Sequence, residues 1–240
     1  MTKNLSSNFV VRIFPLIEPE TFPTEGLKIN KQNLKDAFRF PFGLGEEERE
    51  FLQVAQHTPF YNQSILEDMF MVEHLKLIHA ASKSCEGFAS AIILLKTWLR
   101  QKGLSSPKVH SFNGFLITLV TCHLLNIRKL NKSMSCYQIF KLVIKFLSEL
   151  DIKAGIFWQD GEAPMSQQER QELLSTFDFV FVVPGSTLNV ATHVSKSGLL
   201  ELKRQANGTI QEMNSLVRNS FEQIFLSKPS PLLKFDHVIG

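Results

Sequence analysis

Three consecutive helical segments between residues 61 and 125 constrain the fold of this chain more than any other feature of its sequence. In the first, Ser64 and Glu67 have the spacing of a capping box, in which a hydroxyl and a carboxylate satisfy the free amides of a helix start. In the second, apolar residues recur at helical spacing from Phe88 to Leu99. The third, from Phe112 to Leu125, is apolar almost all round, which predicts a buried central helix.

Two more helix starts are marked further along the chain. Ser135 with Gln138, and Ser166 with Glu169, have the same capping-box spacing. The helix that begins at Ser135 carries an apolar stripe typical of a core-facing surface. The helix that begins at Ser166 is short and ends near Ser175.

A β-hairpin and a long helix are predicted after residue 176. The run from Phe177 to Val183 is typical of a strand, residues 184–186 form a Pro-Gly-Ser turn, and residues 188–194 alternate as a returning strand. One apolar stripe then continues unbroken across Gly208, and a glycine inside a helix costs only about 1 kcal/mol relative to alanine. We therefore predict one helix from about residue 197 to residue 217.

The beginning of the chain has a different character. Phe9–Ile17 is rich in β-branched residues and predicts a strand, whereas the following residues to 58 are loop-like and include the solvated charge run Glu46–Glu50. A lone strand cannot form a stable sheet, so we expect residues 1–58 to be the C-terminal remnant of another domain plus a linker. Residues 59–240 are then the helical domain. The predicted fold class is α+β, mainly helical, with one β-hairpin.

Composition excludes several classes of protein. The chain is 44% hydrophobic and 20% charged, which is an ordinary globular balance. The three cysteines, Cys85, Cys122 and Cys136, are far apart and odd in number, which argues against a disulfide framework or a zinc site. The longest apolar run is too short and too interrupted to cross a bilayer. No metal, cofactor or membrane partner is predicted.

Basic side chains form two clusters that are candidates for contact with nucleic acid. The net charge of +3 permits such contact without requiring it. One cluster lies on and after the second helix, where Gly103 predicts a left-handed cap, and the other follows the third helix. A solvated basic surface and a phosphate-binding surface are both open readings of each cluster. The candidate RNA-binding residues are Lys96, Arg100, Lys102, Arg128, Lys129 and Lys132.

Several motifs together resemble the helical domain of template-independent nucleotidyltransferases, the class that contains poly(A) polymerase, terminal uridylyltransferase and the oligoadenylate synthetases. The resemblance is closer still to the Nrap family of nucleolar RNA-associated proteins, and it covers nearly the whole chain. The initial V-V-R-I-F-P run resembles the closing strand of a nucleotidyltransferase-like domain that is otherwise missing here. The motifs that carry the resemblance are residues 10–15, 61–62, 64–68, 94–101, 112–116, 132–138 and 235–238.

The same resemblance argues against catalysis. Active members of the superfamily hold the triphosphate with a Gly-Ser at a helix start and two metal ions with closely spaced carboxylates. Neither motif precedes the helical segments; the run 18–20 (Glu-Pro-Glu) reads as loop charge, and Gly185-Ser186 lies in the predicted hairpin turn. Active enzymes also usually carry a Ser-Tyr pair where residues 113–115 stand in this chain.

The resemblance implies a non-catalytic RNA- and protein-binding scaffold in nucleolar processing of small-subunit ribosomal RNA. The implied partners are pre-ribosomal RNA, a box C/D small nucleolar ribonucleoprotein and other proteins of the small-subunit processome. The alternative is the helical half of an active nucleotidyltransferase whose catalytic half is missing here. A third class, a protein-interaction module without RNA contact, is also compatible with the residues.

Overall fold

A computed structural model describes residue 18 and residues 21–34, 57–104, 112–158, 165–215 and 221–226. The strand expected at Phe9–Ile17, the charge run Glu46–Glu50 and the C-terminal motif at residues 235–238 lie outside the described residues. The predictions made for these segments, including the origin of residues 1–58 in another domain, stay predictions.

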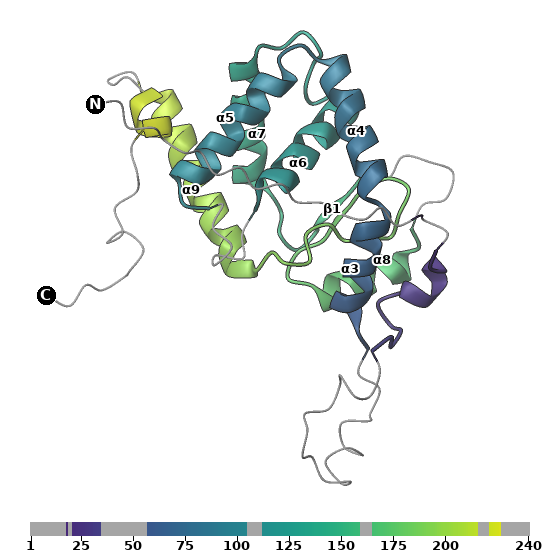
Figure 1. Ribbon diagram of the computed structural model, residues 1–240. Helices are drawn as coiled ribbons and strands as arrows, with labels where there is room; N and C mark the ends of the chain where they lie inside the picture. Colours follow the sequence, from purple (N-terminus) through teal and green to yellow (C-terminus); the bar gives the residue numbers. More distant parts are fainter. Residues whose placement is uncertain are drawn as a thin grey trace, which may run out of the picture.

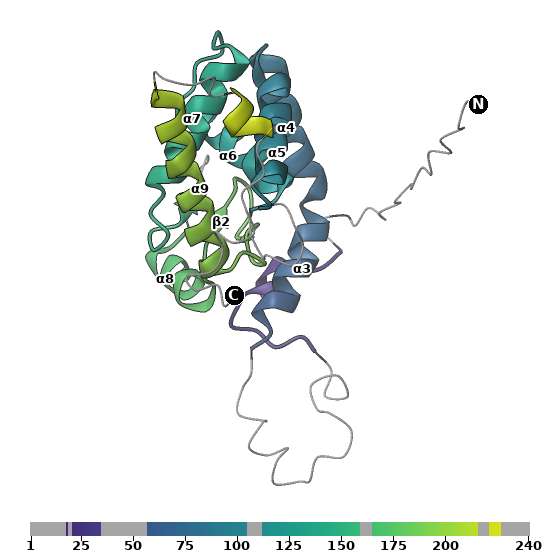
Figure 2. The same cartoon turned by 90° about the vertical axis from the view of Figure 1, so that its left-hand side faces the viewer.

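Helices dominate the described residues, and the predicted mainly helical fold is confirmed (Figure 1). Helices α4 to α7 lie together toward one end of the molecule, α3 and α8 lie toward the other, and α9 and β2 lie between them (Figure 2). The elements in chain order are η1 (Thr24–Leu27), α3 (Pro59–Met69), α4 (Met71–Ser84), α5 (Phe88–Gln101), α6 (Gly114–Asn126), α7 (Cys136–Glu149), β1 (Ile156–Phe157), α8 (Gln167–Thr176), β2 (Phe181–Val182), α9 (Lys196–Asn214) and the π-helical turn η3 (Glu222–Leu226).

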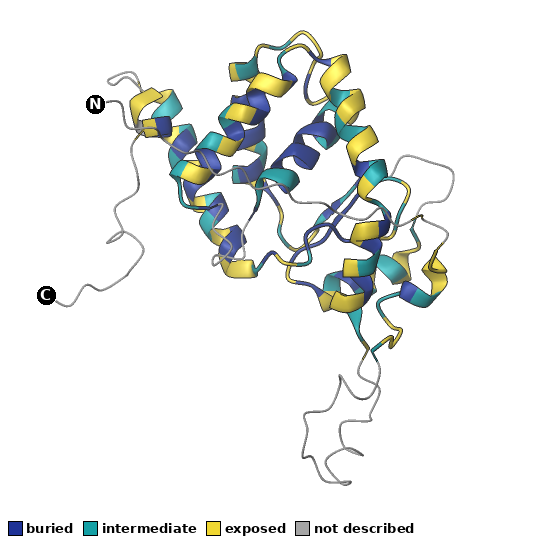
Figure 3. Cartoon of the chain, in the orientation of Figure 1, coloured by how far each residue is buried: buried dark blue, intermediate teal, exposed yellow. Residues whose placement is uncertain are grey.

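Helix α6 is the centre of the core, as its almost uninterrupted apolar sequence predicts. Eight of its residues are buried, including Thr118 and Thr121, and Figure 3 shows it surrounded by the other helices. The two threonine hydroxyls donate to backbone carbonyls one turn earlier, at 2.7 and 2.8 Å, so no polar group is left without a partner by their burial. Helices α4, α5 and α7 pack against α6, and α9 packs against α7.

Trp98 joins α5 to α9. Its side chain is fully buried, and its indole Nε1–H donates to the Oγ1 atom of Thr209 at 2.9 Å. The Thr209 hydroxyl in turn donates to the backbone carbonyl of Gln205 at 2.8 Å. Burying an indole in this way requires a partner for its N–H group, and α9 supplies it. The apolar face expected on α5 is confirmed, since Leu95 and Leu99 are also fully buried.

Two of the three predicted capping boxes are confirmed, at Ser135 with Gln138 and at Ser166 with Glu169. The third prediction is wrong: α3 begins at Pro59, so Ser64 lies inside the helix and its hydroxyl donates to the Tyr61 carbonyl at 2.8 Å. Proline is favoured at the first helical position because it has no N–H to leave unpaired there. Because the helix already starts at Pro59, Ser64 does not serve as its N-cap.

The predicted β-hairpin is also wrong, although the chain does turn at Gly185, whose φ is +82°. Strand β2 pairs in parallel with β1, which the sequence did not predict, and meets the returning chain only at one antiparallel bridge, Val182 with Asn189. The reason is the Asn189 side chain. Its Oδ1 accepts from the Phe181 amide at 2.9 Å and its Nδ2 donates to the Phe179 carbonyl at 2.9 Å, so a side chain takes the place of a second strand.

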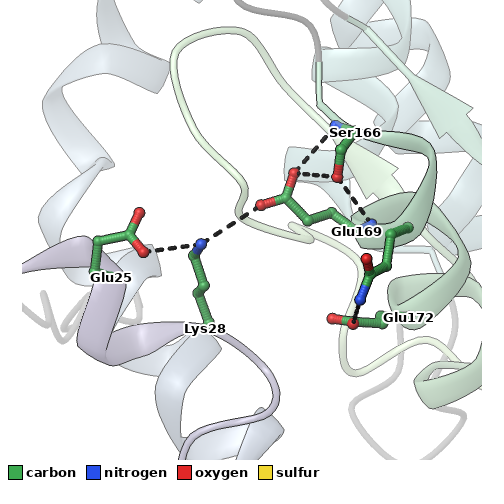
Figure 4. A network of polar contacts seen from close by, with 6 residues as sticks. Glu25, Lys28, Ser166, Glu169 and Glu172 are labelled. Atoms are coloured by element: carbon green, nitrogen blue, oxygen red, sulfur yellow. Dashed lines mark hydrogen bonds and ion pairs between the residues drawn. The ribbon is translucent and has the colours of Figure 1, made fainter.

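The segment around η1 is attached to the helical domain by polar contacts. Asn62, fully buried on α3, donates through Nδ2 to the carbonyls of Lys28 and Lys31 at 2.8 and 3.0 Å. The ammonium group of Lys28 lies 2.8 Å from Glu25 and 3.7 Å from Glu169, whose other carboxylate oxygen closes the α8 capping box with Ser166 (Figure 4). The ion pairs are exposed and contribute little, so the buried amide of Asn62 is the stronger attachment.

The long last helix is confirmed. Helix α9 runs without interruption through Gly208, and outside the helix backbone no atom of the described residues lies within 4 Å of the position that a Cβ would take there. The predicted end near Val217 is three residues too late, because α9 ends at Asn214 and Ser215 has an extended backbone. None of the described helices is both long enough and apolar enough to cross a membrane.

Candidate nucleic-acid interface

Lys96 and Arg100 lie one turn apart on the exposed side of α5. The opposite side of the helix is fixed in the core by Leu95, Trp98 and Leu99, which are all fully buried. The core therefore determines which way the two cations point, and both are open to a ligand in solution. This is the arrangement that the helical spacing predicts for a basic surface.

The aliphatic stem of Lys96 crosses the start of α6 at Gly114. A Cβ at Gly114 would lie 3.1 Å from Cε and 3.2 Å from Cγ of Lys96, which is closer than side-chain atoms usually approach. Glycine at this position thus allows the stem to pass over the helix. The N-terminal end of a helix carries partial positive charge, so Lys96 and α6 both favour an anion at this place.

Asn113 occupies the first amides of α6. Its Oδ1 accepts from the backbone N–H groups of Phe115 and Leu116 at 3.0 and 2.9 Å, and its Nδ2 lies 3.2 Å from Nε2 of His193. Phe115 is half-buried, with its ring 5.6 Å from that of His74. The positions at which the resemblance expects a Ser-Tyr pair are thus used for a helix cap and for packing.

Lys102 does not join Lys96 and Arg100. It lies half-buried just after the end of α5, where burial lowers the pKa of its ammonium group and the nearby Glu212 acts in the opposite direction. The chain turns at Gly103, whose φ of +69° is the left-handed cap predicted from the sequence. Because Glu212 belongs to α9, Lys102 lies close enough to that helix to feel its charge.

The second basic cluster is divided by the loop that follows α6. Arg128 and Lys132 are exposed and line a groove between α4 and α6. Lys129 lies on the other side, with its Nζ atom 5.6 Å from the centre of the Phe146 ring, in a pocket that also contains Glu149. Lys129 therefore already has a ring and a carboxylate nearby, whereas Arg128 and Lys132 have no ion pair with any residue that the structure describes.

The two clusters lie at opposite ends of α6. Lys96 packs at its first residue, Gly114, and Arg128 follows its last residue, Asn126. A helix of 13 residues is about 20 Å long at about 1.5 Å per residue. A single phosphate cannot touch both clusters, so the six predicted residues do not form one site.

Two side chains that could act as a nucleophile or a metal ligand, Cys122 and His74, are buried. Cys122 is buried in the core, and burial raises the pKa of its thiol to about 12, so the thiolate that a nucleophile requires is disfavoured. His74 is buried as well, and desolvation lowers its pKa to about 4. Within the described ranges, no group of three or more His, Cys, Asp or Glu residues has an arrangement suited to a metal ion.

Sequence reasoning missed three polar side chains that organise this fold. Asn62, Gln63 and Asn189 are all buried, and the Asn189 amide donates to Oε1 of Gln63 at 2.6 Å. Asn62 belongs to the 61–62 motif and Gln63 follows it, but a polar pair on a helix gives no signal that it faces inward. Only the distant segments they contact, near residues 28–33 and 189, explain their burial.

The arrangement around α6 is that of a helical domain of the poly(A) polymerase and oligoadenylate synthetase type. Residues 87–228, more than half of the chain, match the Nrap protein PAP/OAS-like domain, and residues 2–84 match Nrap protein domain 1. The chain belongs to the Nrap family. The two matches meet between α4 and α5, and the division predicted at residues 58 and 59 stays a prediction.

Similar proteins carry nucleolar names. Nucleolar protein 6 of Mus musculus is 33% identical over 184 residues, covering 76% of this chain and 16% of the relative. Nucleolar protein 6 of Homo sapiens is 28% identical over 233 residues, covering 95% and 20%. U3 small nucleolar RNA-associated protein 22 of Saccharomyces cerevisiae is 30% identical over 210 residues, covering 80% and 17%.

The chain therefore spans a fifth or less of the length of these curated relatives. The predicted nucleolar location is confirmed by the names of these family members. They are named as nucleolar proteins rather than as enzymes, and the matched domain is described only as PAP/OAS-like.

Proposed function

We propose that this chain is a non-catalytic scaffold segment that binds RNA and protein during nucleolar processing of small-subunit ribosomal RNA. The relatives that carry the names nucleolar protein 6 and U3 small nucleolar RNA-associated protein support the process. Pre-ribosomal RNA, a box C/D small nucleolar ribonucleoprotein and other processome proteins are the proposed partners of the whole protein.

One observation carries the RNA-binding part of the proposal. Lys96 and Arg100 are exposed and one turn apart, and the stem of Lys96 lies at the positive end of α6. Exposed cations of this kind are sufficient to bind the phosphates of an RNA backbone, because phosphate contacts position a nucleic acid without reading its bases. We assign the phosphate contact first to this pair. Lys102 and Lys129 are weaker candidates, because Glu212 lies near the first and Glu149 near the second. Arg128 and Lys132 line a separate groove that also contains apolar side chains.

The non-catalytic part of the proposal rests on residues 113–115. Asn113 already accepts two amide hydrogens of α6, and Phe115 packs beside His74, so neither is placed to hydrogen-bond a nucleotide as a Ser-Tyr pair would. The PAP/OAS-like description of the domain keeps the alternative, the helical half of an active nucleotidyltransferase, as a second candidate.

Anisotropy of a fluorescent single-stranded RNA, titrated at several salt concentrations, tests the assignment. Reversing both charges in a Lys96→Glu, Arg100→Glu variant should lower the affinity and reduce the slope of log K against log salt by about 1.4, at about 0.7 for each lost phosphate contact. The matched control reverses two other exposed lysines, Lys141 and Lys153. Equal losses in both variants would show that only net charge matters.

Crosslinking of the protein that contains this chain to RNA in cells separates the two functions. Recovery of small-subunit precursor RNA and small nucleolar RNA supports the scaffold. Recovery of RNA 3′ ends that carry untemplated nucleotides supports the transferase and contradicts the non-catalytic proposal.

A further inference from the structure

An open groove runs between the C-terminal halves of α4 and α6, close to the loop that follows α6. We call it the α4–α6 groove and define it by Leu77, Ala80 and Ala81 on α4, Leu125 on α6, and Arg128 and Lys132 in the loop. Figure 1 shows both helices leading toward the end of the molecule where the α6–α7 loop lies. The groove is separate from the Lys96 and Arg100 pair, which lies at the other end of α6.

The α4 wall of the groove is low. Leu77, Ala80 and Ala81 share one side of the helix, since they are three and four residues apart. Ala80 is exposed, and Leu77 and Ala81 are half-buried. Alanine side chains leave room for the backbone of a guest to approach, so the surface has the form of an apolar groove that takes the side chains of an amphipathic segment.

The rim of the groove is basic. Arg128 and Lys132 are the charged residues among those that line it, and neither pairs with an acidic residue in the described part of the chain. Arg128 also holds a left-handed backbone conformation, with φ of 57°, at the position after α6 where glycine is usual. Arginine there costs stability, and strained residues of this kind cluster at binding sites.

The base of the groove favours protein over RNA. Trp158 lies there but is only 4% exposed, and its ring is 5.6 Å from that of His123. A nucleobase needs an open aromatic face to stack on, and this ring does not offer one. Aliphatic side chains need only apolar contact, which Leu77 and Leu125 supply.

We propose that the α4–α6 groove binds an acidic, amphipathic segment of a partner protein. The apolar side chains of the segment pack against Leu77, Ala81 and Leu125, and its carboxylates pair with Arg128 and Lys132. This inference rests on the protein-binding part of the proposed function, and it is independent of RNA contact at Lys96 and Arg100.

The test is an NMR titration of the full chain with three probes. The first is a peptide about four turns long with leucines on one helical face and glutamates elsewhere, the second has lysine in place of every glutamate, and the third is single-stranded RNA. The glutamate peptide should shift the amide signals of Ala80, Ala81 and Leu125. The lysine peptide should leave them unchanged.

Three variants locate the contact. Arg128→Gly keeps the left-handed backbone, removes one charge, and should weaken binding of the glutamate peptide by about tenfold, the loss expected for one charge-assisted contact. Ala80→Phe fills the groove from an exposed position and should abolish binding. Ser82→Phe, also exposed but outside the groove, is the matched control and should bind as the unaltered chain does.

Four outcomes overturn the inference: equal binding of the lysine peptide, no groove shifts with the glutamate peptide, groove shifts with RNA alone, or equal effects of Ala80→Phe and Ser82→Phe. Loss of RNA binding in the Lys96→Glu, Arg100→Glu variant is measured separately. The RNA part of the proposed function and the groove can therefore fail or succeed independently.

Discussion

Replacing Thr209 with valine should destabilise the fold through Trp98, on a different helix. The two side chains are 2% and 0% exposed, and the indole N–H has Thr209 Oγ1 as its acceptor at 2.9 Å. Valine keeps the shape of threonine but removes that acceptor. A buried donor left without a partner costs about 1–3 kcal/mol. For a chain of this size, each kcal/mol lowers Tm by about 2–4 °C.

The measurement is a double-mutant cycle by urea unfolding, with Trp98→Phe as the second change. In the Trp98→Phe background no indole donor exists, so Thr209→Val should then cost nearly nothing. The difference between the two backgrounds is the coupling energy, which we expect to be about 1 kcal/mol or more. Equal costs of Thr209→Val in both backgrounds would refute the reasoning, because the hydrogen bond would then contribute nothing to the attachment of α9.

Three other changes have defined outcomes. Leu95→Ala should lower the free energy of unfolding by about 2–5 kcal/mol in urea titrations, whereas Ile93→Ala, at a position 66% exposed, should change it by less than about 0.5 kcal/mol. Arg128→Gly should raise Tm slightly. The left-handed strain that glycine removes is larger than the free-energy cost of the extra flexibility that glycine gives the unfolded chain, and the net gain is about 0.5 kcal/mol. Burial lowers the pKa of His74 from 6.5 to about 4, so between these pH values the unfolded chain binds a proton that the folded chain does not. The free energy of unfolding should therefore fall as the pH drops through that window, and His74→Phe should make the fall smaller. Identical curves of stability against pH for the variant and the unaltered chain would contradict this prediction.

The sequence predicted elements whose causes are local. The capping boxes at Ser135 and Ser166 satisfy their own helix ends, and the apolar stripe through Gly208 belongs to one helix. The sequence-based predictions were wrong where the conformation of a segment depends on a residue far away in the chain. Asn189 replaces a strand by hydrogen-bonding to β2, and β2 finds its parallel partner more than 20 residues earlier in the chain. Neither contact leaves a periodic pattern in the sequence.

The candidate site was predictable only in part, for the same reason. The helical spacing places Lys96 and Arg100 together on the exposed side of α5, as the structure confirms. The number of basic residues says nothing of Glu212 beside Lys102, or of the Phe146 ring beneath Lys129. Such neighbours come from other helices, so only the packing separates six similar cations into different surroundings.

The burial of α6 has a mechanical consequence. Eight of its 13 residues are packed in the core, so α6 can neither bend nor shift without opening that core, and interiors of this density have low compressibility. The surfaces at its two ends are therefore held at one separation and one relative angle. Two molecules that dock at opposite ends of α6 would therefore be held at a constant distance from each other.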